Sequence, residues 1–219
     1  MKFYIDSAII SEIREVASWG ILSGVTTNPS LIAKAGQNFR ETIVEICEIV
    51  KAPVSAEVTT ETAAEMIEQG LEFASWHEQV VIKLPTCVEG LKACSALSDK
   101  GIATNLTLCF SINQALLCAR AGATYVSPFI GRLEDINQDG ISLLHDIRQA
   151  FMDHGLETEI ISASIRTPQH VTLSALAGAQ IATIPYRIFG QLIQHPLTDR
   201  GIAQFMEDWH KVSPDHRVG

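Results

Sequence analysis

A short β-type run followed by a helical pattern recurs along the whole chain, and this alternation limits the possible folds more than any other feature. Amphipathic helical spacing fills the intervening segments, as in Ile43, Ile46, Cys47 and Val50. Runs of apolar and β-branched residues predict eight strands, at residues 2–6, 24–28, 54–58, 80–84, 102–107, 125–130, 159–164 and 181–186. Strands that alternate with helices in this way are typical of α/β proteins with a parallel sheet.

Two architectures fit this alternation: a closed (β/α)8 TIM barrel and an open doubly wound sheet. The open sheet would usually carry a glycine-rich phosphate turn after its first strand, but residues 7–11 read SAIIS and contain no glycine. No Pro/Gly/Ser-rich linker divides the chain, so we expect one domain over residues 1–212. The barrel is therefore favoured, and it requires functional residues at the carboxyl ends of several strands.

Composition and charge exclude several classes of function. The formal net charge of −9 argues against binding to nucleic acid or to an anionic membrane surface. The five cysteines form no CxxC pair, and the seven histidines form neither HxH nor HExxH, so we expect buried, reduced thiols and no metal site. No apolar run approaches the roughly 18 residues of a membrane span, and the N-terminus shows no signal peptide. We expect a cytoplasmic protein.

The carboxyl ends of the expected strands are unusually polar. The simplest interpretation is that each such residue caps the following helix, which suits single Ser and Thr residues well. It suits Glu57 and Lys83 less well, because unpaired charges within apolar runs would cost several kcal/mol. A shared pocket at the barrel mouth explains both. Its candidate residues are Asp6, Thr26, Asn28, Glu57, Lys83, Asn105, Thr107, Ser127, Arg132, Ser164 and Arg166.

Strand alternation adds two expectations about direction. Asn105 and Thr107 share one parity, and so do Ser162 and Ser164. Because alternate residues of a barrel strand face the interior, each pair is expected to point inward together.

Lys83 lies in the run VVIKLP, where a cation is out of place. The run alone leaves two possibilities open: a lysine that snorkels from a strand end, and a buried amine. In a polar pocket near Arg132 and Arg166, desolvation and like charge would favour the neutral amine. A neutral amine can attack a ketone and form a Schiff base, with carboxylates to move protons and guanidinium groups to bind a phosphate.

The chain closely resembles the transaldolases, in particular their short branch, which also contains the fructose-6-phosphate aldolases. The motifs that carry this resemblance are GVTTNPSLIAKAG (24–36), VVIKLPTCVEGLKA (80–93), ATNLTLCFSINQA (103–115), SPFIGRLED (127–135) and SASIRT (162–167). The resemblance implies a class I aldolase barrel that needs no metal and no organic cofactor. It also implies a reaction of the pentose phosphate pathway, in which dihydroxyacetone passes between sugar phosphates.

The resemblance also implies a role for each candidate. Lys83 would be the Schiff-base nucleophile, Asp6 would act on the C4 hydroxyl, and Glu57 would exchange protons through a water that Thr107 also holds. The dihydroxyacetone portion would contact Asn28, Asn105 and Ser127, and the phosphate would bind to Arg132, Ser164 and Arg166. Thr26 and Phe129 are also expected to bind substrate.

Three positions favour transaldolase over aldolase within this branch. Fructose-6-phosphate aldolases typically have glutamine in place of Glu57 and tyrosine in place of Phe129, and they typically lack the NLT pattern of residues 105–107. Without a hydroxyl at residue 129, a bound enamine should persist until an acceptor arrives. The alternatives are an aldolase that releases free dihydroxyacetone and, from another class, a non-catalytic barrel that binds sugar phosphates.

Residues 198–212 are expected to form an extra amphipathic C-terminal helix with Ile202, Phe205, Met206 and Trp209 on one stripe. Two partners are possible for this stripe: the helix's own barrel, or a neighbouring subunit. The resemblance implies the neighbour, in a homo-oligomer of five or ten subunits. Residues 213–219 lack apolar periodicity and are expected to be a disordered tail.

Overall fold

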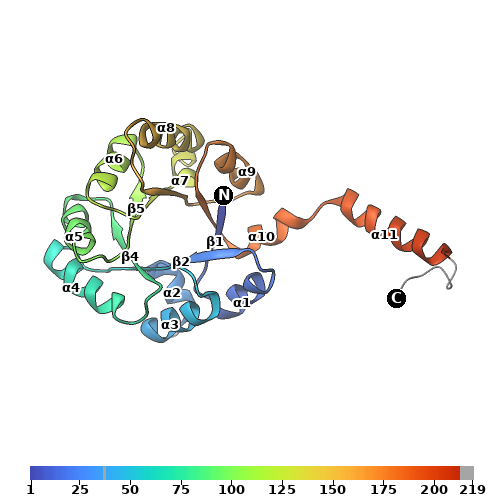
Figure 1. The fold of residues 1–219 in the computed structure, drawn as a ribbon, viewed down its shortest axis with the longest axis horizontal. Coiled ribbons are helices and arrows are strands. Elements are labelled where there is room, and N and C mark those ends of the chain that lie inside the picture. The colour runs from blue at the N-terminus through green and yellow to red at the C-terminus, as the bar shows by residue number, and fades with distance from the viewer. Residues whose placement is uncertain (37, 213–219) are drawn as a thin grey trace.

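The chain folds into a closed barrel of eight parallel strands in sequence order (Figure 1). The structure, a computed structural model, describes residues 1–36 and 38–212. The strands are β1 (Lys2–Asp6), β2 (Leu22–Thr26), β3 (Val54–Glu57), β4 (Val80–Pro85), β5 (Thr104–Cys109), β6 (Tyr125–Pro128), β7 (Glu159–Ser162) and β8 (Ile181–Ile184). All eight expected strands are present, and β1 pairs with both β2 and β8 to close the barrel. The predicted (β/α)8 fold is confirmed.

Helices surround this barrel on its outside, as Figure 1 shows. The helices of the described residues are α1 (Ile10–Ser18), α2 (Pro29–Ala35), α3 (Phe39–Val50), α4 (Ala63–Ala74), α5 (Val88–Ser98), α6 (Ile112–Arg120), α7 (Ile130–Glu134), α8 (Gly140–Asp153), α9 (Pro168–Leu176), α10 (Tyr186–Ile193) and α11 (Pro196–Lys211). The short helices α2 and α7 are additions to the loops that follow β2 and β6, at the mouth of the barrel.

Local sequence signals explain where several helices begin. Thr62 and Glu65 form a reciprocal capping box at the start of α4. Thr167 caps α9, and Pro168 occupies the first turn, where its missing N–H leaves no bond unmade. The αL conformation of Gly122, with φ of 86°, follows the end of α6 and turns the chain toward β6.

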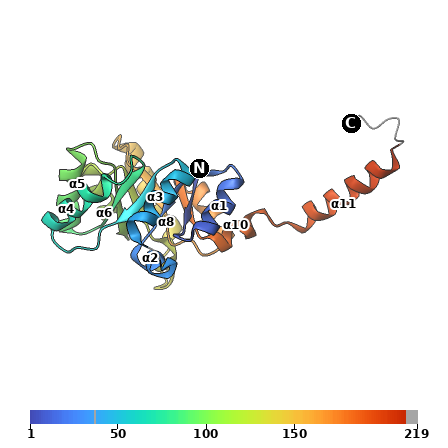
Figure 2. The ribbon, with the colours of Figure 1, turned by 90° about the horizontal axis from the view of Figure 1, so that it is seen from below.

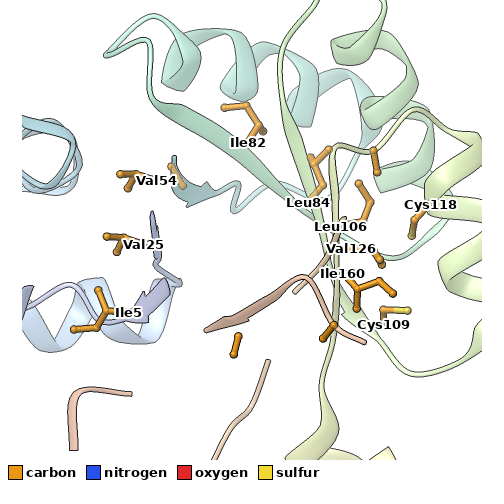
Figure 3. Packing of buried hydrophobic residues seen from close by; sticks show 14 of the residues in the cluster. Ile5, Val25, Val54, Ile82, Leu84, Leu106, Cys109, Cys118, Val126 and Ile160 are labelled. Atoms are coloured by element: carbon orange, nitrogen blue, oxygen red, sulfur yellow. The ribbon is translucent and has the colours of Figure 1, made fainter. Parts of the chain in front are cut away.

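The outward faces of the strands supply the main hydrophobic core. Val25, Ile82, Leu106 and Val126 are fully buried there and pack in one cluster with apolar side chains of the surrounding helices (Figure 3). Four of the five cysteines are buried, and Cys109 and Cys118 belong to this cluster. Burial raises the pKa of the Cys109 thiol to about 12, which suits the expected structural role of these thiols.

A second, smaller cluster fills the barrel interior near the amino ends of the strands. We call it the lower layer, and its members are Tyr4, Val81, Tyr125, Ile161 and Ile181. Gly24 makes room for it, because a Cβ there would lie 2.6 Å from Cε1 of the Tyr4 ring. The barrel therefore contains packed side chains rather than a channel.

Most of the next inward-facing residues toward the carboxyl ends are polar. Strand residues alternate between interior and exterior, so the residues two positions after the lower layer also face inward. We call the four polar residues among them, Asp6, Lys83, Ser127 and Thr183, the upper layer; the fifth, Ala163, is apolar and also lines the cavity. Thr26 follows Gly24 in the same way and joins them. The change from apolar to polar within two residues positions the candidate site.

Helix α11 extends away from the barrel (Figures 1 and 2). None of its residues is buried, and Phe205 and Trp209 of its apolar stripe are exposed. Packing against its own barrel, one of the two possibilities left open by the sequence, is therefore wrong. The expected disordered tail, residues 213–219, lies outside the described residues. No helix in residues 1–36 and 38–212 has the length and apolar character needed to cross a membrane.

Candidate active site

Lys83 lies inside the barrel near the carboxyl end of β4 and is 5% exposed. Its Nζ donates to the Thr27 carbonyl at 2.9 Å and lies 2.8 Å from Oε2 of Glu57. The parallel register places Glu57 of β3 and Asn105 of β5 beside Lys83 on either side. The snorkelling lysine considered from the sequence is therefore wrong: the side chain is buried and paired with a carboxylate.

Asp6, at the end of β1, provides the second carboxylate. The Thr26 hydroxyl donates to its Oδ1 at 2.8 Å, and Thr183 on β8 lies 2.5 Å from the same Thr26 oxygen. Burial is the largest influence on the pKa of Asp6 and raises it. The positive charge of Lys83 and the Thr26 hydrogen bond lower this pKa, and the negative charge of Glu57 raises it. The net shift of the Asp6 pKa is upward.

A buried amide network occupies the side of β5 and β6. Ser127 donates to Oδ1 of Asn105 at 2.7 Å, and Nδ2 of Asn105 donates to the Ser55 hydroxyl at 3.2 Å. These bonds fix which end of the Asn105 amide faces each neighbour.

These side chains border a cavity of about 170 Å³ at the barrel mouth, lined by Asp6, Thr26, Asn28, Lys83, Ser127, Phe129, Arg132, Ala163, Ser164 and Thr183. An adjoining space shares Lys83 and Phe129 with it and brings in Glu57 and Thr107. The Thr107 hydroxyl is buried and makes no hydrogen bond within the described residues. Such an oxygen is available to a ligand or a water molecule in this space.

Asn28 fits both interpretations of the polar strand ends. Its Oδ1 accepts from the Leu31 N–H at 3.0 Å and so caps α2, as a purely structural residue would. The residue also lines the cavity. Because Oδ1 already accepts the capping bond, the Nδ2 group offers its two N–H donors to a ligand.

Cationic and hydroxyl groups gather at the side of the cavity formed by α7 and the residues after β7. Arg132 lies over the Phe129 ring, with Cζ 5.1 Å from the ring centroid, and both residues line the cavity. Ser164 lines it too, in a left-handed conformation with φ of 62°. Arg166 does not: its guanidinium donates to both carboxylate oxygens of Asp135.

The structure brings eleven of the twelve sequence-predicted residues to the cavity, the adjoining space or the amide network that borders them, and leaves Arg166 at the rim. One expectation is wrong. Ser162 points outward and bonds to Ser174 on α9, because Ile161 is the inward-facing residue of β7. Ser164 reaches the cavity only because β7 ends at Ser162 and the chain then turns.

Sequence reasoning missed Thr183 and Ser55. Both were present in expected strands, IATIPY and VSAEV, as single hydroxyl residues within apolar surroundings. Their parity with the lower layer and with Glu57 was the available signal, since residues two apart face the same side.

A (β/α)8 barrel with a buried lysine and two carboxylates at its carboxyl-end mouth has the arrangement of an enzyme active site. The chain belongs to the Transaldolase/Fructose-6-phosphate aldolase family, whose profile matches residues 3–215, and it is an enzyme of that family.

Curated relatives agree with this family. A protein of Symbiobacterium thermophilum named "Probable transaldolase" is 58% identical over 209 residues, which cover 95% of this chain and 97% of the relative. A protein of Alkaliphilus metalliredigens with the same name is 57% identical over 95% of this chain and 98% of its own length. A third "Probable transaldolase", from Geobacter sulfurreducens, is 56% identical over 97% of this chain and 99% of its own length.

Solved structures of much lower identity share the fold. The thiamine phosphate pyrophosphorylase of Pyrococcus furiosus superposes with a TM-score of 0.60 at 12% identity, over 87% of this chain and 93% of that one. The carboxyl transferase domain of Rhizobium etli pyruvate carboxylase gives 0.62 at 11% identity, over 84% of this chain and 39% of that one. At these identities the likeness concerns the barrel alone.

Proposed function

We propose that this protein is a transaldolase that transfers a dihydroxyacetone unit between sugar phosphates through a Schiff base on Lys83. The proposed donors are sedoheptulose 7-phosphate and fructose 6-phosphate, and the acceptors are glyceraldehyde 3-phosphate and erythrose 4-phosphate, as in the pentose phosphate pathway. The observation that carries the proposal is the buried Lys83 amine, 2.8 Å from Glu57, in a cavity that Asp6 also lines.

The first half of the reaction uses the two carboxylates in different ways. Glu57 takes one proton from the paired Lys83 ammonium, and the free amine attacks the C2 ketone. Two of the three ammonium protons pass in turn through Glu57 to the C2 oxygen, which leaves as water, and the nitrogen keeps the third proton in an iminium. Asp6 then takes the proton of the C4 hydroxyl. The C3–C4 bond breaks, its electron pair moves into the iminium to give an enamine, and C4 leaves as the aldehyde of the shortened sugar.

The second half reverses these steps with a new aldose. The enamine carbon attacks the acceptor aldehyde, Asp6 returns its proton to the new alkoxide, and water releases the product from Lys83. The raised pKa of Asp6 supports this role, because the same group must accept and return one proton. The unpaired Thr107 hydroxyl, in the space that Glu57 also lines, supports a water held between the two residues.

Phe129 supports transfer over release. Its ring lines the cavity and packs against Phe110, with centroids 6.1 Å apart, so this part of the cavity wall carries no hydroxyl group. An enamine beside this ring has no phenol hydroxyl to protonate it, and it therefore persists until an aldose arrives. A fructose-6-phosphate aldolase is the alternative within the family.

Borohydride trapping tests the chemistry. Reduction in the presence of fructose 6-phosphate should add one dihydroxyacetone-derived adduct at Lys83, located by peptide mass. Lys83→Met should abolish the adduct and lower the transfer rate by about 10³-fold or more, because the nucleophile itself is lost. Lys92→Met, which removes an exposed lysine paired with Glu89 at 2.6 Å, is the matched control and should leave both unchanged.

The dependence on acceptor separates the candidate functions. A transaldolase should consume fructose 6-phosphate only when erythrose 4-phosphate is present. Rapid release of free dihydroxyacetone without an acceptor would assign the aldolase instead. A non-catalytic sugar-phosphate-binding barrel would gain thermal stability from fructose 6-phosphate but give no adduct.

We also propose that the protein is a cytoplasmic homo-oligomer of five or ten subunits held together by α11. The exposed stripe of Ile202, Phe205, Met206 and Trp209 supports this, since a helix with an uncovered apolar face gains stability from a partner. Mass measurement in solution, on the full chain and on Phe205→Glu, tests the assembly.

A further inference from the structure

Two arginines lie near α7, but only one of them borders the cavity. Arg132 is fixed over the Phe129 ring and lines the cavity. Arg166, which the family resemblance implies as a second phosphate-binding residue, instead donates through Nη1 and Nη2 to the two oxygens of Asp135. A guanidinium that forms this bidentate pair offers its best-aligned edge to the carboxylate and not to the substrate.

The backbone of Arg166 is held firmly beside the cavity. Its N–H donates to Nδ1 of His170 at 3.3 Å, and Nε2 of His170 lies 3.0 Å from Oε2 of Glu134. Gly131 packs against the same segment, where a Cβ would lie 2.8 Å from Nε of Arg166. These contacts hold the Arg166 main chain next to α7, so we expect the guanidinium end of the side chain to be the part that reorients.

The Arg166–Asp135 pair itself is suited to exchange. The two side chains are 42% and 51% exposed, so each remains partly hydrated, and exposed ion pairs contribute little stability. A phosphomonoester carries a charge of about −1.5 to −2 at pH 7 and three acceptor oxygens, compared with one charge and two oxygens on Asp135. A phosphate at the cavity rim can displace the carboxylate, whereas a neutral hydroxymethyl group cannot.

We propose that Asp135 is a specificity-determining residue that competes with the substrate phosphate for the Arg166 guanidinium. In the absence of phosphate, Asp135 holds Arg166 outside the cavity. A phosphorylated sugar releases Arg166 from Asp135 and gains it as a second cation beside Arg132. Sugars without a phosphate leave the pair intact and gain nothing from Arg166. The inference rests on the proposed function for the phosphorylated substrate and adds Asp135 as the residue that opposes phosphate binding by Arg166.

If Asp135 competes with phosphate, Asp135→Asn should strengthen phosphate binding. If Asp135 instead positions Arg166 for phosphate, the same substitution should weaken it. Asp135→Asn removes the negative charge and keeps the shape, so it frees Arg166 if Asp135 competes. The dissociation constant for inorganic phosphate, measured by calorimetry, should fall by about two- to fivefold, the range that corresponds to an exposed ion pair. The KM for fructose 6-phosphate should fall with it. A weaker or unchanged phosphate affinity would overturn the proposal, because Asp135 would then orient Arg166 or be irrelevant to it.

A double-mutant cycle separates the pair from a general change of charge. In an Arg166→Ala background, Asp135→Asn should leave phosphate affinity unchanged, and a gain of equal size there would overturn the proposal. Glu45→Gln, which breaks the remote exposed Arg14–Glu45 pair of 2.9 Å, controls for net charge. Borohydride trapping at Lys83 of the wild-type protein reports on the proposed function independently, so the two hypotheses can fail separately.

Discussion

The lower and upper layers of the barrel interior are built on the same strands, face the same way and lie only two residues apart, yet they differ in almost every property. The lower layer contains two tyrosines and three aliphatic side chains that pack against one another. The upper layer contains a carboxyl group, an amine and hydroxyl groups. The comparison teaches that one strand can supply stability at one inward position and chemistry at the next. The sheet fixes the direction of both side chains, but close packing restricts the residue type only in the lower layer.

The largest expected loss of activity comes from the upper-layer substitution Asp6→Asn. The amide keeps the shape and still accepts from Thr26, but it cannot take the C4 proton. We expect the transfer rate to fall by about 10²- to 10⁴-fold, the usual contribution of a general base. A coupled assay with fructose 6-phosphate and erythrose 4-phosphate measures it, and a loss below tenfold would mean that another group takes the proton.

The same variant gives a second readout in stability. The folded-state pKa of Asp6 is raised above 3.8 by burial, so ionising Asp6 costs the folded protein free energy that the unfolded chain does not lose. That cost appears as pH rises from about 3.8 through the raised pKa. Asp6→Asn should therefore unfold at higher urea concentration than the wild type at neutral pH, and the difference should vanish in acid below 3.8. A variant less stable at pH 7 would contradict the shift.

Gly24→Ala tests the lower layer. A Cβ at this position would press on the Tyr4 ring, which Tyr125 confines from another side with ring centroids 6.5 Å apart. Overpacking of this kind costs about 1–3 kcal/mol in the free energy of unfolding. Urea denaturation should show the loss, while the transfer rate per folded molecule should change little. If activity fell as steeply as stability, the two layers would not be separable.

The smallest expected effect comes from Thr183→Val. Valine keeps the volume but removes the hydroxyl that bonds to Thr26, and Thr26 retains its bond to Asp6. Losing one such contact in the upper layer should lower the transfer rate by about fivefold, equivalent to one ordinary hydrogen bond. Thr183→Ser should restore the rate, and equal activity in all three proteins would show that Thr183 only fills space.

The sequence was sufficient to predict the barrel because the pattern that indicates it is repeated eight times. An error of two residues at one strand, as at β2 or β5, does not change the alternation of strands and helices. Lys83, Glu57 and Asp6 could be predicted because a charge inside or at the end of an apolar run costs free energy unless it faces a polar pocket.

The remainder of the site depends on contacts between segments that are distant in sequence. The pairing of Arg166 with Asp135 joins the segment after β7 to the end of α7, and neither local sequence indicates it. Ser162 and Ser164 share a parity and were expected to point inward together. Because β7 ends at Ser162 and the chain turns through a left-handed conformation at Ser164, only Ser164 reaches the cavity. Thr183 has the residue type of an ordinary β-branched strand residue, so only its parity with Ile181 could have indicated an inward-facing hydroxyl.

The register of the central strands has a consequence for how the enzyme is assembled. Glu57, Lys83 and Asn105 are direct neighbours in one row across β3, β4 and β5. A slip of one residue in either pairing would turn that whole strand over, so that Lys83 would face the helices and Ile82 or Leu84 the cavity. Closing the barrel correctly and bringing the amine to its carboxylate are therefore a single event during folding. A refolding chain should recover its capacity to form the borohydride-trapped adduct at the same rate as its native interior packing, with no later maturation step.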